Sequence, residues 1–156
     1  MKNIASITFC LFSMLFVVSC SEDDSNDNGF SSAELVGTWD LVEVNVSDGV
    51  DLDGDGSSSS NLMDEESCIS GSIVLRDDST YQFEVSNFTL TAITNGLYYA
   101  QCSGSTQATG AWASNGTEVV FQGSTVLGTL QLSNNRIVQT VGDDLPGILS
   151  YVYELR

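Results

Sequence analysis

The sequence predicts an all-β protein: a single antiparallel, up-and-down β-barrel of about eight strands, preceded by a cleaved signal peptide. Three observations favour this fold. Apolar and polar residues alternate with a period of two over most of the chain beyond residue 33, and turn sequences at residues 77–79, 95–96, 115–116 and 134–135 separate these stretches. The connections are too short for crossover helices, so neighbouring strands are expected to run antiparallel and to close into a barrel.

The first 19 residues have the composition of a signal peptide. Lys2 provides a positive charge, and residues 4–18 form an apolar stretch that is too short to cross a bilayer of about 30 Å comfortably. The stretch ends at residues 16–20 (FVVSC), which resemble a lipobox. This resemblance implies cleavage before Cys20, lipid on the Cys20 thiol and attachment to a membrane. An ordinary signal peptide with an incidental cysteine is the alternative.

Residues 20–32 predict a lipidated cysteine followed by a flexible acidic tether. The nine residues after Cys20 include four carboxylates and no apolar side chain, a composition that does not support a packed core. The acidic cluster also resembles an export signal of outer-membrane lipoproteins. The expected location is therefore the outer membrane, with a periplasmic and a cell-surface orientation both open.

Residues 33–156 are expected to form one domain, since 124 residues suffice for one core but not for two. The clearest alternation places Tyr81, Phe83 and Val85 on one face of a strand. A second alternating set near the end of the chain contains Leu149, Tyr151, Tyr153 and Leu155. About eight strands are predicted, two of which can merge, over residues 37–46, 71–76, 80–87, 89–94, 97–102 or nearby, 108–113, 117–122, 126–132, 136–141 and 148–155.

The first predicted strand opens with Gly37-Thr38-Trp39, which resembles the Gly-x-Trp signature of lipocalin-like domains in small bacterial lipoproteins. The resemblance implies that Gly37 turns the chain into the barrel floor and that Trp39 plugs its closed end. Residues 109–112 and 151–155 resemble later parts of the same domains. In lipocalins an arginine near the last strand packs on the tryptophan, and Arg136 and Arg156 are the candidates here. A different antiparallel barrel or a sandwich with Trp39 in its core is the alternative.

Two cysteines remain for pairing in the mature domain. Cys10 would leave with the signal peptide and Cys20 would carry lipid, so Cys68 and Cys102 are expected to form a disulfide in an oxidising compartment. Two buried free thiols are the alternative.

The charge balance excludes several classes of partner and of reaction. The chain has 21 acidic and four basic residues and no histidine, and Lys2, its only lysine, lies in the signal peptide. Nucleic acid is therefore not expected as a partner, because phosphate backbones require a basic surface. Histidine-dependent nucleophilic catalysis and zinc sites, and lysine-dependent chemistry, are also excluded. We expect a monomer that is not an enzyme and that requires no cofactor.

One segment contains a candidate metal site. Asp51, Asp53 and Asp55 occupy the first, third and fifth positions of an acidic loop and Gly56 the sixth, as in calcium-binding loops. The twelfth position is Leu62 rather than glutamate, so residues 64–66 would have to provide the remaining ligands, presented by a helical turn that starts after Ser60 or Asn61. The alternative is a solvated acidic turn without an ion. In either case the segment before Ile73 is expected to form a lid over the barrel mouth.

Two functions are consistent with these features. The first is a membrane-anchored, non-enzymatic lipoprotein whose barrel binds a small hydrophobic or amphipathic ligand. The second is a surface interaction or structural lipoprotein that uses the acidic lid to contact a protein or glycan. The aromatic residues that would line a ligand site are Tyr81, Phe83, Tyr98, Tyr99, Phe121, Tyr151 and Tyr153.

Overall fold

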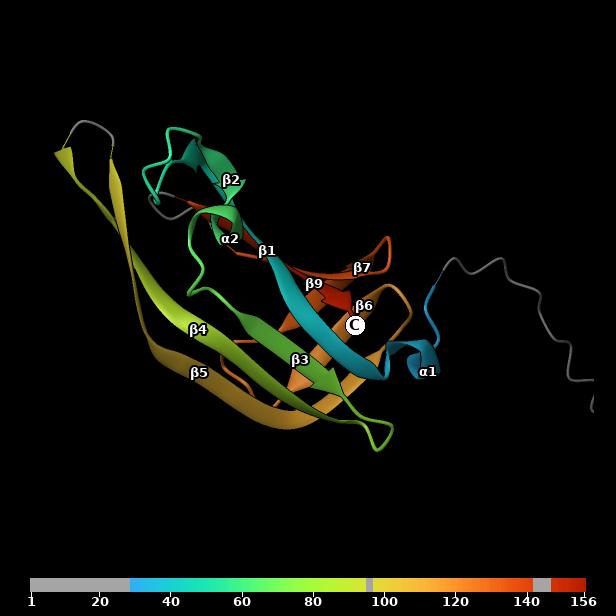
Figure 1. Ribbon diagram of the computed structural model, residues 1–156. Coiled ribbons are helices and arrows are strands. Elements are labelled where there is room, and N and C mark those ends of the chain that lie inside the picture. The colour runs from blue at the N-terminus through green and yellow to red at the C-terminus, as the bar shows by residue number, and fades with distance from the viewer. Residues whose placement is uncertain (1–28, 95–96, 142–146) are drawn as a thin grey trace, which may run out of the picture.

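The computed structural model describes residues 29–94, 97–141 and 147–156, which form a closed antiparallel β-barrel (Figure 1). Each strand pairs with the next from β3 to β9, and β1 pairs with both β3 and β9 to close the barrel. A short strand, β2, pairs with the far end of β1. The predicted fold is confirmed. The elements are α1 (Ser32–Leu35), β1 (Gly37–Val50), β2 (Ser59–Asn61), α2 (Leu62–Glu65), β3 (Gly71–Leu75), β4 (Thr80–Ala92), β5 (Tyr98–Ser114), β6 (Glu118–Gln122), β7 (Thr129–Ser133), β8 (Arg136–Thr140) and β9 (Ile148–Leu155).

The predicted turns connect these strands. The backbones of Ser79, Asn134 and Asn135 have positive φ angles, which tight hairpin turns require, as does Gly116 between β5 and β6. The predicted Asn95-Gly96 turn, the signal peptide, Cys20 and the tether up to residue 28 lie outside the described residues.

Four of the predicted strands merge into two long ones. The ranges 80–87 and 89–94 form β4, and 97–102 and 108–113 form β5. Their register shifts between Ser86 and Phe88, where Gly104 has a φ of +72° and β5 contributes an extra residue to a β-bulge. The β4–β5 hairpin therefore continues past its neighbours. We call residues 87–94 and 97–106 the arm; Figure 1 shows it extending beyond the barrel, on the opposite side from α1.

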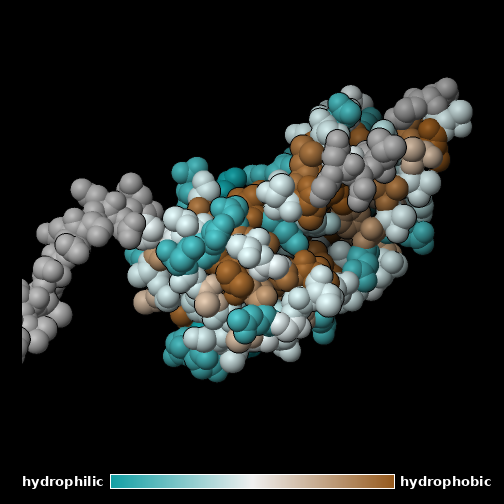
Figure 2. Space-filling model, turned by 180° about the vertical axis from the view of Figure 1, so that it is seen from behind, coloured by the Kyte–Doolittle hydropathy of each residue, from teal (hydrophilic) through white to brown (hydrophobic). Residues whose placement is uncertain are grey.

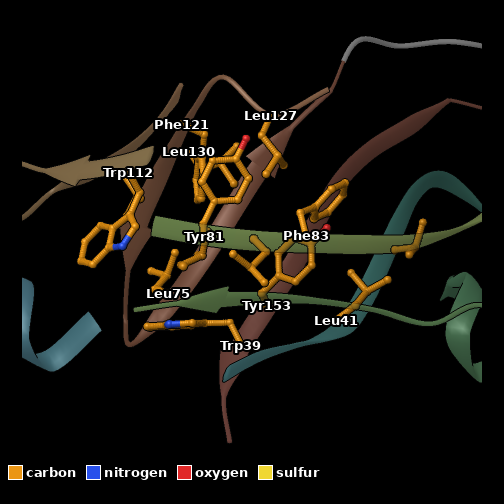
Figure 3. Packing of buried hydrophobic residues seen from close by; sticks show 14 of the residues in the cluster. Trp39, Leu41, Leu75, Tyr81, Phe83, Trp112, Phe121, Leu127, Leu130 and Tyr153 are labelled. Carbon is orange, nitrogen blue, oxygen red and sulfur yellow. The ribbon is translucent and has the colours of Figure 1, made fainter. Parts of the chain in front are cut away.

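Large hydrophobic side chains fill the barrel interior. Among the described residues, no polar or charged residue is buried. Tyr81 and Phe121 pack edge to face with ring centroids 4.9 Å apart. Figure 3 shows side chains from different strands of the barrel pointing toward one another; the buried ones that it labels include Trp39, Leu75, Tyr81, Phe83, Phe121, Leu130 and Tyr153.

The predicted alternation holds in β4 but fails at the start of β9. Tyr81 and Phe83 are buried and Val85 is half-buried, as expected for one face. Leu149, however, is 40% exposed, because the register between β1 and β9 skips it: Ser150 pairs with Asn45 and Ile148 with Val46. This bulge turns Leu149 outward and lets Ile148 pack against the core instead.

The end of the barrel next to α1 is closed. The Trp39 side chain has no exposed surface, and its Nε1–H donates to the carbonyl oxygen of Leu35 in α1 (2.9 Å). Gly37 has a φ of +154°, and a Cβ atom there would lie 2.7 Å from the Leu155 side chain, so the position favours glycine. Arg156 donates to Asp40, and Arg136 forms ion pairs with carboxylates of β1 and β9.

Candidate functional site

The lid, residues 51–70, packs against the end of the barrel opposite α1. β2 extends the sheet beside β1, and Asn61 caps α2 by accepting a hydrogen bond from the Met63 N–H. The predicted helical turn after Asn61 is therefore confirmed. Leu62 and Ile69 are buried in the same cluster as the barrel core. The lid is thus a packed part of the domain rather than a loose insertion.

A disulfide joins the lid to the arm. Cys68 follows α2, and Cys102 lies in β5 on the side of the arm that faces the core. Their Cα atoms are 6.2 Å apart, and 34 positions separate them in the sequence. The predicted pairing is present in the structure.

Three lid carboxylates converge. One oxygen each from Asp51, Asp53 and Glu65 lies within 4.8 Å of the others. Asp51 also accepts hydrogen bonds from the N–H groups of Gly54 and Gly56, which hold the loop in a tight turn. Such oxygens suit a hard cation such as calcium, and Glu65 of α2 is the residue among 64–66 whose carboxylate lies near the two aspartates.

Asp55 is not part of this convergent group. Its carboxylate accepts a hydrogen bond from the Ser57 N–H instead. The structure therefore brings together two of the three loop aspartates that the sequence pattern selected, and adds a glutamate from a different element.

The aromatic residues proposed to line a ligand site occupy different environments. Tyr81, Phe83, Phe121 and Tyr153 are buried in the core cluster. Tyr98 and Tyr151 are half-buried at its edge, whereas Tyr99 is 58% exposed. The four buried rings pack against neighbouring side chains, so within the barrel they act as core residues.

Two of these tyrosines have buried hydroxyl groups without a partner. The Tyr81 and Tyr153 hydroxyls are inaccessible to solvent, and neither has a hydrogen-bond partner among the described residues. Burial raises the pKa of Tyr153 far above its ordinary value, and nearby Tyr151 adds to the effect. Burial also raises the pKa of Tyr151. An unpaired buried hydroxyl is costly, so these two groups are unusual features of the interior.

Three hollows lie on the outside of the barrel. One of about 430 Å³ spans the wall where β1 and β3 diverge, and Asp40, Gly71 and Glu84 are among its lining residues. Hydrogen bonds from the Ser105 hydroxyl and the Gln107 side chain lower the pKa of Glu84. A second hollow, of about 480 Å³, lies between β5 and the loop after β6, and a third, of about 390 Å³, lies beside α1. None of the three is lined by an aromatic residue proposed for ligand binding.

Charge is distributed unevenly at this end of the molecule. Residues 48–66 carry seven carboxylates and no basic residue, whereas residues 85–117, which include the arm, carry no charged side chain over 33 positions. The sequence shows that this stretch has no charged residue. Only the structure shows that much of the stretch belongs to one projecting hairpin, formed by β4 and β5. Figure 2 shows apolar side chains gathered in the middle of one face and toward the end where the arm lies.

Comparison with known protein families, with curated proteins and with solved structures finds no match. The closed eight-strand barrel with Trp39 at its closed end is consistent with a lipocalin-like domain. Within the described ranges, no helix has the length and apolar character needed to cross a bilayer.

Proposed function

We propose that this protein is a lipid-anchored, non-enzymatic lipoprotein that presents the lid and arm of its barrel to a macromolecular partner. The supporting observation is that the barrel's own side chains occupy its interior, while the lid, the arm and the disulfide lie outside it at one end. That end combines an acidic lid, a charge-free arm and a disulfide that joins them.

The position of the described N-terminus supports this orientation. The chain enters the domain beside the closed end, where the Phe30 N–H donates to the Gly116 carbonyl oxygen (3.0 Å). The arm extends on the opposite side (Figure 1). A lipid on Cys20 would hold the closed end nearer the membrane and direct the lid and arm away from it.

Calcium binding to Asp51, Asp53 and Glu65 would fit this function. A divalent cation would reduce the repulsion among the lid carboxylates and fix the loop against α2. It would also provide a cationic point on an otherwise acidic surface, through which a carboxylate or a glycan could be held.

Lipidation and orientation can be tested together. We expect mass spectrometry of the membrane fraction to find a mature N-terminus at Cys20 carrying diacylglycerol, and a Cys20→Ala variant to leave that fraction. If the domain faces outward, protease added to intact cells removes it, with a periplasmic protein as the protected control. Recovery of the wild-type chain in soluble form, with an unmodified Cys20, would refute the anchor.

A small-ligand function is the second candidate, because of the two unpaired hydroxyls. A ligand with polar atoms that reached the interior could satisfy the Tyr81 and Tyr153 hydroxyls, provided that neighbouring side chains moved. A fatty-acid-like fluorescent probe separates the two functions. Saturable quenching of Trp39 and Trp112 emission would favour the small-ligand function, and the display function predicts none.

A further inference from the structure

The outer edge of β5 has no strand beside it over most of its length. β5 pairs with β4 along nearly all its residues, but its pairing with β6 covers only Ala111–Ser114. From 98 to 109 no strand within the described residues pairs with the other edge. A row of backbone donors and acceptors is therefore left without strand partners.

One backbone hydrogen bond shows which backbone groups face this edge. The Trp112 N–H donates to the carbonyl oxygen of Ser79 (2.8 Å), on the β4 side. Because backbone groups alternate in direction along a strand, those of odd-numbered residues between the bulge and Ala111 face away from β4. The residues concerned are Ser105, Gln107 and Thr109, all of which are exposed.

This edge lacks most of the features that usually protect exposed strands. Natural edges commonly carry lysine, proline or inward-pointing charges, and the 17 residues of β5 contain none of these. The bulge at Gly104 interrupts the edge but leaves a regular stretch of five residues from Ser105 to Thr109. That stretch can therefore accept another extended chain.

The edge also borders a hollow that could receive side chains. The space of about 480 Å³ lies between Gln107–Thr109 on β5 and residues 123–126 of the loop after β6. Val126 in this loop is substantially exposed and offers an apolar surface. A chain added to the edge would place alternate side chains toward this loop.

We propose that the 105–109 edge of β5 binds an extended, uncharged segment of a partner protein, flanked by basic residues, by β-strand addition. The backbone groups of the edge complement another polypeptide strand rather than a sugar or a lipid. Residues 85–117 carry no charge, so the partner segment that pairs with the edge needs no charged residue. The rest of the chain gives a formal net charge of −17, which attracts basic residues on either side of that segment. The same net charge opposes a second copy of this chain, which would be equally acidic.

A designed peptide tests the proposal on the full chain purified in mild detergent. The probe is a dye-labelled KTVTVTVTK peptide, and its binding is followed by fluorescence anisotropy. We expect saturable one-to-one binding that weakens at high salt, and weaker binding of the matched peptide ETVTVTVTE. A peptide N-methylated at every residue from the second to the eighth has no N–H donor along either edge of this segment and should lose about tenfold or more in affinity.

Two substitutions at one position provide the matched protein variants. Gln107→Pro removes the N–H that faces the free edge, while the ladder to β4 does not use that N–H. Gln107→Ala removes the side chain and keeps the N–H. We expect Gln107→Pro to weaken probe binding about tenfold or more and Gln107→Ala to change it less than about threefold. If Gln107→Pro fails to fold, the N-methylated peptide still decides the question with the unaltered protein.

Several results would overturn the proposal. They are absence of saturable binding, equal binding of the N-methylated peptide, or equal binding by Gln107→Pro. A dimer in sedimentation velocity that Gln107→Pro dissociates would replace the partner segment with a second copy. The proposal rests on the display function, but the two fail separately, because anchoring and orientation are measured on cells and strand addition on the purified chain.

Discussion

The disulfide between lid and arm should account for a large share of the stability of this domain. Cys68 and Cys102 close a loop with a sequence separation of 34, which contains β3, all of β4 and the outer part of β5. In the chain-entropy treatment, such a loop restricts the unfolded state by about 4 kcal/mol. For a domain of this size, the loss corresponds to a fall in Tm of about 15 °C.

The assay is urea unfolding of the oxidised wild type and of a double variant, Cys68→Ser with Cys102→Ser. We expect the midpoint of the variant to be lower by an amount equivalent to about 4 kcal/mol, and a reductant to affect only the wild type. Hydrogen exchange should accelerate in the arm before it accelerates in β3, because the arm lacks other strand neighbours. Free energies of unfolding that differ by less than about 1 kcal/mol between the two proteins, with unchanged hydrogen exchange in the arm, would refute this reasoning.

The remaining predictions concern the core and the lid. Tyr153→Phe should leave stability at pH 7 unchanged or raise it by up to about 1 kcal/mol, because the lost hydroxyl has no partner. Burial raises the pKa of Tyr153 in the folded state. The free energy of unfolding is therefore unaffected by this titration below the unfolded-state pKa of about 10. It falls at higher pH, because there the unfolded state releases the proton and the folded state does not. Urea unfolding at pH 7 and above pH 10 should therefore show weaker alkaline destabilisation in Tyr153→Phe than in the control Tyr99→Phe. Trp39→Phe should lower the free energy of unfolding by about 2 to 4 kcal/mol in the same assay, since it leaves a cavity and an unpaired Leu35 carbonyl. A decrease below about 1 kcal/mol would contradict the role of Trp39 in closing this end of the barrel. Millimolar calcium should raise Tm in the wild type and in Asp55→Asn but not in Asp53→Asn, and an unchanged wild-type Tm would exclude the site.

Local patterns predicted most of the barrel. Period-two alternation located Tyr81 and Phe83 on the buried face of β4, and turn chemistry located the hairpins at Ser79, Gly116 and Asn134. These features depend on residues close in sequence, so one chain is enough to read them. The capped turn at Asn61 is local in the same sense.

The errors arose where the structure depends on distant contacts. The bulge that exposes Leu149 is set by the pairing of β9 with β1, more than 100 positions away, and no pattern within β9 announces it. The extent of β4 and β5 depends on where β3 and β6 stop pairing with them. The calcium site remains a prediction, and its ligand set also depends on the fold, because Glu65 lies with Asp51 and Asp53 whereas Asp55 does not.

The pairing of the first barrel strand with the last also constrains the order of assembly. Trp39 lies opposite Leu155, so the seam that completes the cylinder joins residues near the two ends of the domain. Until β9 has been synthesised and has paired with β1, the hydrophobic face of β1 remains partly uncovered. Such non-local topologies fold on a timescale of about milliseconds to seconds. Deleting the last eight residues would therefore produce an open, aggregation-prone sheet rather than a slightly smaller barrel.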